Sequence, residues 1–204
     1  MIPMKKWLFP LYVTLLTCII SAYAYAESPD NTKLKNLNKG IFIVANEQLD
    51  YTSLRHTVIY VIQHDDAGTS GIIINRPTNL TINEAFPEVK ASEALNQTLN
   101  FGGPLHTQYL FMLTQTKFTH GLFEVSQGVY FGTGDELKMR LQAEKTIDKT
   151  KVFGGFISWG PGQLENDILK GNWIITPGNP DEIFSDNAEK LWAVLHDRWA
   201  GSWI

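Results

Sequence analysis

Short apolar runs rich in β-branched residues, separated by turn-forming residues, recur along most of this chain. Runs of this length, bounded by glycine, asparagine or proline, are typical of buried β-strands. The clearest runs predict strands over residues 41–45, 57–63 and 71–75, and the turn-rich stretch 64–70 predicts that the last two form an antiparallel hairpin. Further runs predict strands over residues 109–114, 122–126, 129–131, 151–159 and 173–176.

Helix-start and helix-stop signals lie between these strands. Thr81 and Glu84 have the spacing of a capping box, which predicts a short helix that ends before Pro87. Pro161 suits the first turn of a helix and Gly171 suits a C-terminal cap, so we expect a helix between them. Helical segments are also predicted over residues 90–97 and 135–145.

A last helix is predicted after Ser185, which we expect to be its N-cap. Apolar residues recur there at helical spacing, at Ala188, Leu191, Trp192, Leu195 and Trp199. Strands and helices do not alternate one for one along the chain, which argues against a doubly wound parallel sheet. We therefore predict an α+β fold with a mostly antiparallel or mixed β-sheet core, open or curled toward a barrel, and about five helices packed around it.

The first 26 residues have the composition of a secretory signal peptide. Lys5 and Lys6 precede an apolar run over residues 7–20, and Ala24 and Ala26 supply small residues for a cleavage site. The run is shorter than the ~20 residues that a membrane-spanning helix needs. We expect cleavage after Ala26 and export to the periplasm or the medium, with a retained N-terminal anchor as the alternative. The chain then divides into a leader (1–26), a flexible polar spacer (27–39) and one domain (40–204).

Cysteine content and charge narrow the chemistry further. Cys18 lies in the expected leader and is the one cysteine of the sequence, so the mature protein forms no disulfide and no cysteine-ligated metal site. The chain has 17 basic residues, including Lys5 and Lys6 of the leader, against 21 acidic ones, and the basic residues do not cluster. Nucleic-acid binding requires a basic face, so we expect no nucleic-acid partner. An anionic membrane surface is disfavoured for the same reason, and we expect no stable membrane insertion after cleavage.

Several motifs together resemble the AlgH/YqgE family of bacterial proteins. They are, in chain order, Gly40 to Ala45, His64, Gly68, Gly71 to Pro77, Gly102-Gly103-Pro104, Gly155, and Trp159 to Glu165. Each motif is common by itself, whereas their order and spacing are specific, and the resemblance covers about residues 40 to 200. It implies a single α+β domain, a proposed regulatory role, no established catalytic mechanism and, for most members, a cytoplasmic location.

The chain departs from the family pattern at a few positions. Asn46-Glu47 stands where members usually have Met-Pro, Tyr51-Thr52 stands for Asp-Pro, and Gly171 stands for an asparagine. The largest departure is the expected leader, since family members are typically cytoplasmic. A cytoplasmic role linked to transcription therefore does not suit this chain.

The motifs define a candidate binding site formed by three turns. An arginine at a strand end can hold an anion through a bidentate contact, and the backbone N–H groups of a glycine turn can do the same. A polar helix start beside a tryptophan completes the set, which comprises Asn75, Arg76, Gly102, Gly103, Pro104, Trp159, Gly162, Gln163 and Glu165. For each motif, a purely structural role in a turn or a helix cap is the alternative.

Two hypotheses of function follow from these residues. We favour a non-catalytic binding or interaction module for a small molecule or a protein, which requires the three turns to lie together. The alternative is a hydrolase or transferase that uses Glu165 and His64 as an acid/base pair, which requires their side chains to lie within reach of one substrate. A regulatory role, as implied by the family, is a third possibility. We expect no cofactor and no metal.

Overall fold

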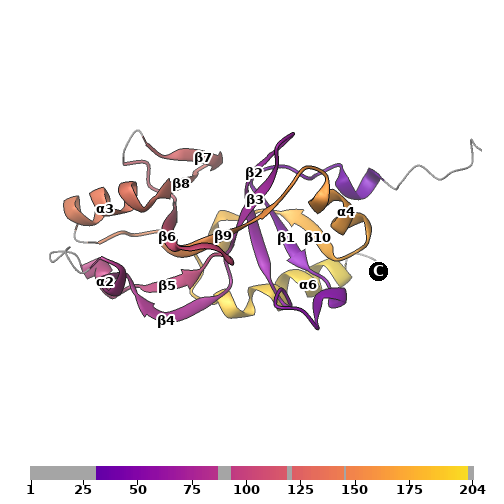
Figure 1. The fold of residues 1–204 in the computed structure, drawn as a ribbon. Coiled ribbons are helices and arrows are strands. Elements are labelled where there is room, and N and C mark those ends of the chain that lie inside the picture. Colours follow the sequence, from indigo (N-terminus) through magenta and orange to yellow (C-terminus); the bar gives the residue numbers. More distant parts are fainter. Residues whose placement is uncertain (1–30, 87–92, 119–120, 145, 202–204) are drawn as a thin grey trace, which may run out of the picture. The chain divides into compact units, whose positions relative to one another are not determined.

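The computed structural model describes residues 31–86, 93–118, 121–144 and 146–201 of the 204-residue chain. The described sheet and α-helices all belong to one compact unit, Lys33–Ile204 (Figure 1). The expected leader and the start of the expected spacer lie outside the described residues. Residues Leu34 and Leu37, at the end of that spacer, pack partly buried against the core.

The strands form one large sheet. They are β1 (Ile41–Ala45), β2 (Val58–Asp65), β3 (Gly68–Ile73), β4 (Pro77–Thr81), β5 (Thr98–Phe101), β6 (Leu105–Thr114), β7 (Phe123–Ser126), β8 (Val129–Thr133), β9 (Thr150–Trp159) and β10 (Trp173–Pro177). Their order is β10-β1-β2-β3-β9-β6-β8-β7, and β5 pairs with β9 and with β4. Among these described strands only β5 and β9 pair in parallel, and the sheet does not close into a barrel.

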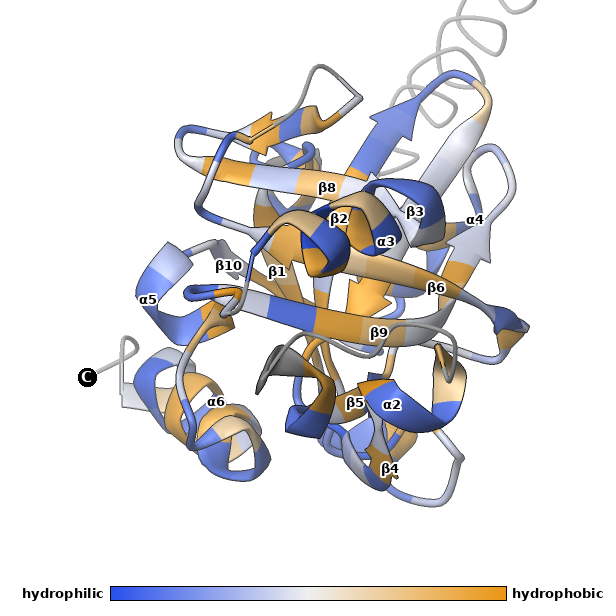
Figure 2. Ribbon diagram, turned by 90° about the vertical axis from the view of Figure 1, so that its left-hand side faces the viewer, coloured by the Kyte–Doolittle hydropathy of each residue, from blue (hydrophilic) through white to orange (hydrophobic). Residues whose placement is uncertain are grey.

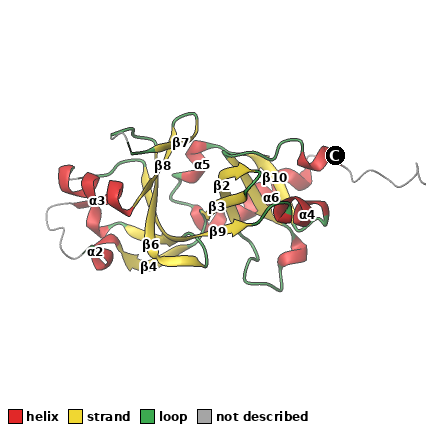
Figure 3. Cartoon of the chain, turned by 45° about the horizontal axis from the view of Figure 1, so that its top comes forward, coloured by secondary structure: helices red, strands yellow, loops and turns green. Residues whose placement is uncertain are grey.

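Five α-helices cover this sheet in the part of the chain that the structure describes. They are α2 (Ile82–Ala85), α3 (Gly134–Ala143), α4 (Gln163–Leu169), α5 (Pro180–Ile183) and α6 (Leu191–Gly201). Figures 1 and 3 both show α2 and α3 beside β4, β6 and β8, whereas α4 and α6 lie beside β1 and β10. The predicted α+β class with a mostly antiparallel sheet is therefore confirmed. No helix within the described residues has the length and apolar character needed to cross a membrane.

Strand β9 connects two halves of the sheet. Its last residues pair with β3, at Trp159 with Thr69, while its first residues pair with β5 and β6. One core cluster lies around Ile43, Ile59 and Trp159, and another lies under α3, around Met112 and Leu137. Figure 2 shows apolar residues concentrated on the central strands. Successive side chains of a strand point to opposite faces of the sheet, so neighbouring residues of β9 pack in different clusters.

The boundaries of several elements differ from the prediction. Strands β4 and β5 were not predicted, because β4 is polar and begins at Pro77, a residue that is tolerated at the first position of an edge strand. The last helix begins at Leu191 and not at Ser185. The Oγ atom of Ser185 instead accepts from the backbone N–H of Asn187, just before a short 3-10 helix at Ala188–Lys190. The capping box of Thr81 and Glu84 is confirmed, and it starts the short helix α2.

Candidate functional site

The turn between β9 and α4 is closed by its own polar groups. The Oε1 atom of Gln163 accepts from the backbone N–H of Gly160 at 2.7 Å, and Gly162 is the N-cap residue in the left-handed conformation, with φ 72°. A residue with a Cβ atom rarely adopts that backbone conformation, so glycine suits this position. Pro161 lies in the turn and not in the first helical turn, since α4 begins at Gln163. The motif therefore has a structural use in shaping this junction.

Trp159 and Glu165 flank this turn with different surroundings. The indole of Trp159 is 9% exposed and packs edge-on against Trp173, with 5.8 Å between ring centroids. The carboxylate of Glu165, by contrast, reaches solvent and lies 3.9 Å from Nε2 of His64. Trp159 is thus a core residue, whereas Glu165 is available for chemistry.

Sheet register brings His64 next to Glu165. His64 pairs with Thr69 across the β2–β3 hairpin, and Thr69 pairs with Trp159 on β9, which leads into α4. The Nδ1 atom of His64 lies 2.8 Å from Oγ1 of Thr69, so one ring nitrogen meets a hydroxyl and the other meets a carboxylate. His64 and Glu165 therefore lie close together, and the acid/base hypothesis further requires that both reach one substrate.

Asn75 and Arg76 tie the end of β3 to the loop before β2. The Asn75 side chain accepts from the N–H of Val58 and donates to the carbonyl of His56, both at 2.8 Å. Arg76 donates through Nη2 to three oxygens, which are the carbonyls of Ser53 and Arg55 and the hydroxyl of Thr57. Burial, and to a smaller extent the charge of Arg55, lowers the pKa of Arg76. These contacts are those of a structural clamp.

The glycine turn after β5 crosses close to β9. Gly102 accepts from the N–H of Ile73 and donates to the carbonyl of Gly154, both at 2.8 Å. Gly103 has φ 154°, and a Cβ atom there would lie 2.2 Å from the carbonyl carbon of Phe156. Pro104 then leads into β6. The backbone of this turn is used in contacts within the sheet.

The three turns do not share one location. Trp159 and Glu165 lie at the start of β3, next to Thr69, whereas Asn75 follows its end. Six residues of strand separate the two ends, a distance of roughly 20 Å at ~3.3 Å per residue. Gly102 contacts Ile73, near the Asn75 end. The structure thus brings Glu165 together with His64 but not with Arg76.

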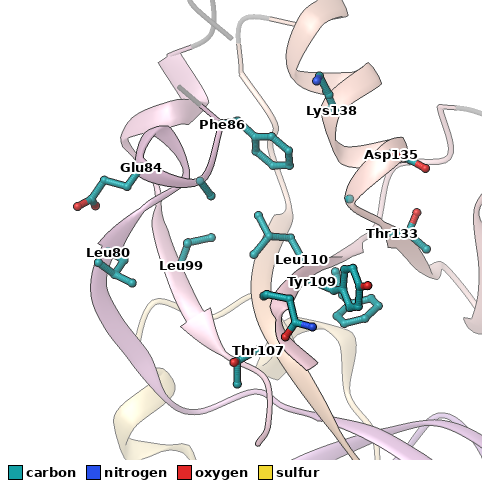
Figure 4. Close-up of a pocket in the computed structure, with 14 residues that line it drawn as sticks. Leu80, Glu84, Phe86, Leu99, Thr107, Tyr109, Leu110, Thr133, Asp135 and Lys138 are labelled. Carbon is teal, nitrogen blue, oxygen red and sulfur yellow. The ribbon is translucent and has the colours of Figure 1, made fainter. Parts of the chain in front are cut away.

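A groove formed by none of these motifs lies between α2 and β5 on one side and β6 and α3 on the other. It has a volume of 870 Å³. Figure 4 shows Phe86, Leu99 and Leu110 directed toward its interior and Thr133 and Asp135 at its edge. Tyr109, on its wall, is 59% exposed. Sequence reasoning missed this groove because its lining comes from several separate elements, and only the helix caps at α2 and α3 carry local signals.

Capping boxes fix the starts of the two helices beside the groove, α2 and α3. Thr133 is the N-cap of α3 and forms a capping box with Glu136, and Thr81 forms one with Glu84 at α2. The hydrogen bond from the Thr133 hydroxyl lowers the pKa of Glu136. Among the described residues, no group of three or more His, Cys, Asp or Glu side chains is arranged to hold a metal ion.

The sequence of this chain matches one family model and several known bacterial proteins. The AlgH-like family model matches residues 42–203. A UPF0301 protein of Mycobacteroides abscessus is 27% identical over 175 residues, which cover 83% of this chain and 84% of that protein. A UPF0301 protein of Cytophaga hutchinsonii is 30% identical over 160 residues, covering 76% of this chain and 86% of that protein.

Solved structures show the same fold. The solution structure of the AlgH protein from Pseudomonas aeruginosa matches with a TM-score of 0.65 at 23% identity, covering 78% of this chain and 87% of that one. A crystal structure from Corynebacterium diphtheriae matches with a TM-score of 0.64 at 19% identity, covering 80% and 88%. At these identities the likeness concerns the fold alone. The family model spans most of the chain, and the chain therefore belongs to the AlgH-like family.

Proposed function

We propose that this protein is a non-catalytic binding module whose ligand site is the groove between α2, β5, β6 and α3. The observation that carries the proposal is the groove itself, with a volume of 870 Å³ and apolar side chains on its floor. Ligand sites are commonly clefts of ~300–1,000 Å³ that combine apolar walls with a few polar groups. Leu99 and Leu110 provide the apolar floor, and Thr133 and Asp135 provide polar groups at the edge.

Exposed apolar side chains at this groove favour occupation. Leu80 is 52% exposed and Tyr109 is 59% exposed, and both line the same groove. Covering apolar surface contributes ~25 cal/mol per Å², so a ligand that covers ~200 Å² would gain about 5 kcal/mol before the entropic costs of binding. A small apolar molecule with a polar end matches this lining.

We further propose that the module acts outside the cytoplasm, after removal of the first 26 residues. The basic start, the apolar run and the small residues before Glu27 support this location. Intact-mass analysis of protein recovered from the periplasmic fraction would show a chain that begins at Glu27. A full-length chain in the cytoplasmic fraction would contradict the proposal.

The binding proposal is tested with a dye that becomes fluorescent on apolar surface, anilinonaphthalene sulfonate. We expect saturable binding, weakened about tenfold when Tyr109→Ser and Leu80→Ser are combined, because the groove then loses two apolar contacts. Met139→Ser is the matched control, since Met139 is 49% exposed on α3 but does not line the groove. Equal dye affinity in all three proteins would refute the assignment of the groove. Native mass spectrometry of the same preparation then identifies any retained small molecule.

A second candidate function is acid/base catalysis by His64 and Glu165, favoured by the 3.9 Å between Nε2 and Oε1. The negative charge of Glu165 beside Nε2–H would orient the imidazole and stabilise the imidazolium, and Nδ1 would accept the proton of the Thr69 hydroxyl as that oxygen attacks a substrate, by analogy with the triads of hydrolases. Thr69 is only 2% exposed, which argues against its meeting a substrate. Hydrolysis of p-nitrophenyl acetate by the wild type, lost in His64→Gln, would support this candidate, and equal rates in both would eliminate it.

A further inference from the structure

A second cavity lies on the face of β5 opposite to the groove. Successive residues of a strand point to opposite faces, so Leu99 lines the groove while Thr98 and Asn100 line this cavity, the polar basin. The basin has a volume of 730 Å³. Its other walls come from the start of β9, the loop before it, and the turn at Ala188–Lys190 that precedes α6. It is thus independent of the groove proposed above.

The lining of the basin is dense in hydrogen-bonding groups of both kinds. The residues that line it include Asn96, Gln97, Asn100 and Asn187, whose side chains carry carboxamides. It also contains three lysines and three carboxylates, Lys149, Lys151, Lys190, Asp148, Asp186 and Glu189. Carboxamides donate and accept, lysines donate, and carboxylates accept. The three positive and three negative formal charges cancel, so these six side chains carry no net charge together.

Two polar side chains of the basin are fixed by the fold. Asn100 is 7% exposed and donates from Nδ2 to the carbonyl of Val152 at 3.1 Å. Lys151 is half-buried and donates from Nζ to the carbonyl of Ser185, and burial lowers its pKa, partly offset by Asp186. An ammonium group has three donors. Positions fixed before binding reduce the entropy that binding costs.

An apolar wall accompanies these polar groups. Phe184 lines the basin while it packs, partly buried, against a core cluster, and Pro77 and Ala188 also line the basin. A ligand with a dense set of polar groups and one apolar face therefore finds both kinds of surface here. Hydroxyl groups match the polar side, because each hydroxyl both donates and accepts a hydrogen bond.

From this lining we propose that the polar basin binds a small, uncharged, polyhydroxylated molecule of the saccharide class. Ring hydroxyls contact the carboxamides and Lys151, and the C–H face of the sugar ring packs on Phe184. Hydrogen bonds to neutral and charged groups set the affinity for the sugar. Loss of a single charged donor is therefore expected to lower that affinity by about tenfold.

Saturation-transfer NMR on the full chain tests this proposal with glucose, N-acetylglucosamine and maltose as probes. We expect transfer to the ring protons of at least one of them, and an affinity about tenfold lower in Lys151→Met, which keeps the side-chain length but removes the charged donors. Asn187→Leu, at an exposed position of the basin, repeats the test if Lys151→Met does not fold. Lys170→Met is the control, because Lys170 is exposed after α4 and away from the basin.

Every outcome decides the question. Transfer that the folded basin variant weakens and Lys170→Met preserves supports the proposal. Absence of transfer for all three sugars, or transfer that the basin variants leave unchanged, overturns it. If inorganic phosphate displaces a bound sugar at equal concentration, the basin is an anion site and the saccharide class is wrong. Dye binding at the groove is unaffected in each case, so failure here is distinguishable from failure of the proposed function.

Discussion

Arg140 donates from Nη1 to the hydroxyl of Thr150 at 2.7 Å, deep under α3, where the arginine is only 2% exposed. The same nitrogen donates to Thr114, and Nε donates to Glu144 at 3.1 Å. The guanidinium also lies 4.9 Å from the ring centre of Phe118. A buried charge of this kind is compatible with folding only when hydrogen bonds and a counter-charge compensate its lost hydration. Arg140 thus joins α3 to β6 and β9.

Replacing Arg140 by alanine should destabilise the domain by roughly 3 kcal/mol, because a cavity forms and several hydrogen bonds are lost. Urea denaturation with a fixed m-value measures this change. Met139→Ala, on the exposed side of the same helix, should change the stability by no more than ~0.5 kcal/mol. Similar stability of the two variants would show that the Arg140 contacts contribute nothing.

Replacing Arg76 by alanine should lower the free energy of unfolding by about 2 kcal/mol, because three oxygens of the loop lose a charged donor. Arg76→Lys keeps the charge but not the forked geometry, so it should recover less than half of the loss. Thermal unfolding of the three proteins provides the comparison. A variant as stable as the wild type would contradict the structural clamp and restore Arg76 as a candidate ligand-binding residue.

Replacing Gly103 by alanine should cost about 3 kcal/mol or more, because the new Cβ would lie 2.2 Å from the backbone of Phe156. Gly128 is the matched control. It also has a positive φ, 74°, but a Cβ atom there meets nothing within 4 Å, so Gly128→Ala should cost only about 1 kcal/mol. Chemical denaturation of both variants separates the close approach of the chains from the backbone strain. Equal losses would argue against a tight crossing at Gly103.

Tyr60 should make the stability depend on pH in the alkaline range. Burial raises its pKa to about 12 from 10.0, opposed by the hydrogen bond with Ser126 at 2.8 Å. The folded-state pKa lies above the unfolded one, so the stabilising effect is complete below about pH 10 and is lost as the pH rises through about 12. The predicted slope from this residue is up to ~1.4 kcal/mol per pH unit.

Tyr60→Phe should cost about 1 kcal/mol at neutral pH, through the lost hydrogen bond, and should then lose stability more slowly than the wild type above about pH 10. Urea denaturation across the alkaline range measures both effects. Tyr51→Phe, at a fully exposed position, should follow the wild-type curve throughout. Parallel curves for Tyr60→Phe and the wild type would mean that Tyr60 does not titrate in this way.

Local patterns in the sequence predicted the elements that local forces decide. The run at residues 41–45 is apolar at every position and forms a buried strand, and Thr81 with Glu84 forms the expected cap. Strand β4 was missed because its polar residues follow Pro77 and its pairing with β5 depends on contacts far along the chain. Propensity is a weak guide to a strand when its partner is absent from the local sequence.

The candidate sites divide in the same way. The turns could be recognised from the sequence because turns require particular residue types, such as glycine and asparagine. In the structure Gly102, Asn75 and Arg76 form hydrogen bonds that hold these turns to neighbouring strands and loops. The groove and the polar basin had no local signal. Each is lined by residues from several separate elements, so it exists only once β5, β6 and β9 are assembled.

The sequence by itself determined the fold class, most strands, the start of α2 and the family, because these depend on residue type and spacing along the chain. The tertiary structure alone decided that His64 meets Glu165, that Arg76 lies roughly 20 Å from that pair, and that two cavities occupy opposite faces of β5. Strand register is the physical reason. It is set by pairing between distant segments and by which face is buried, and a shift by one residue would place every side chain on the other face.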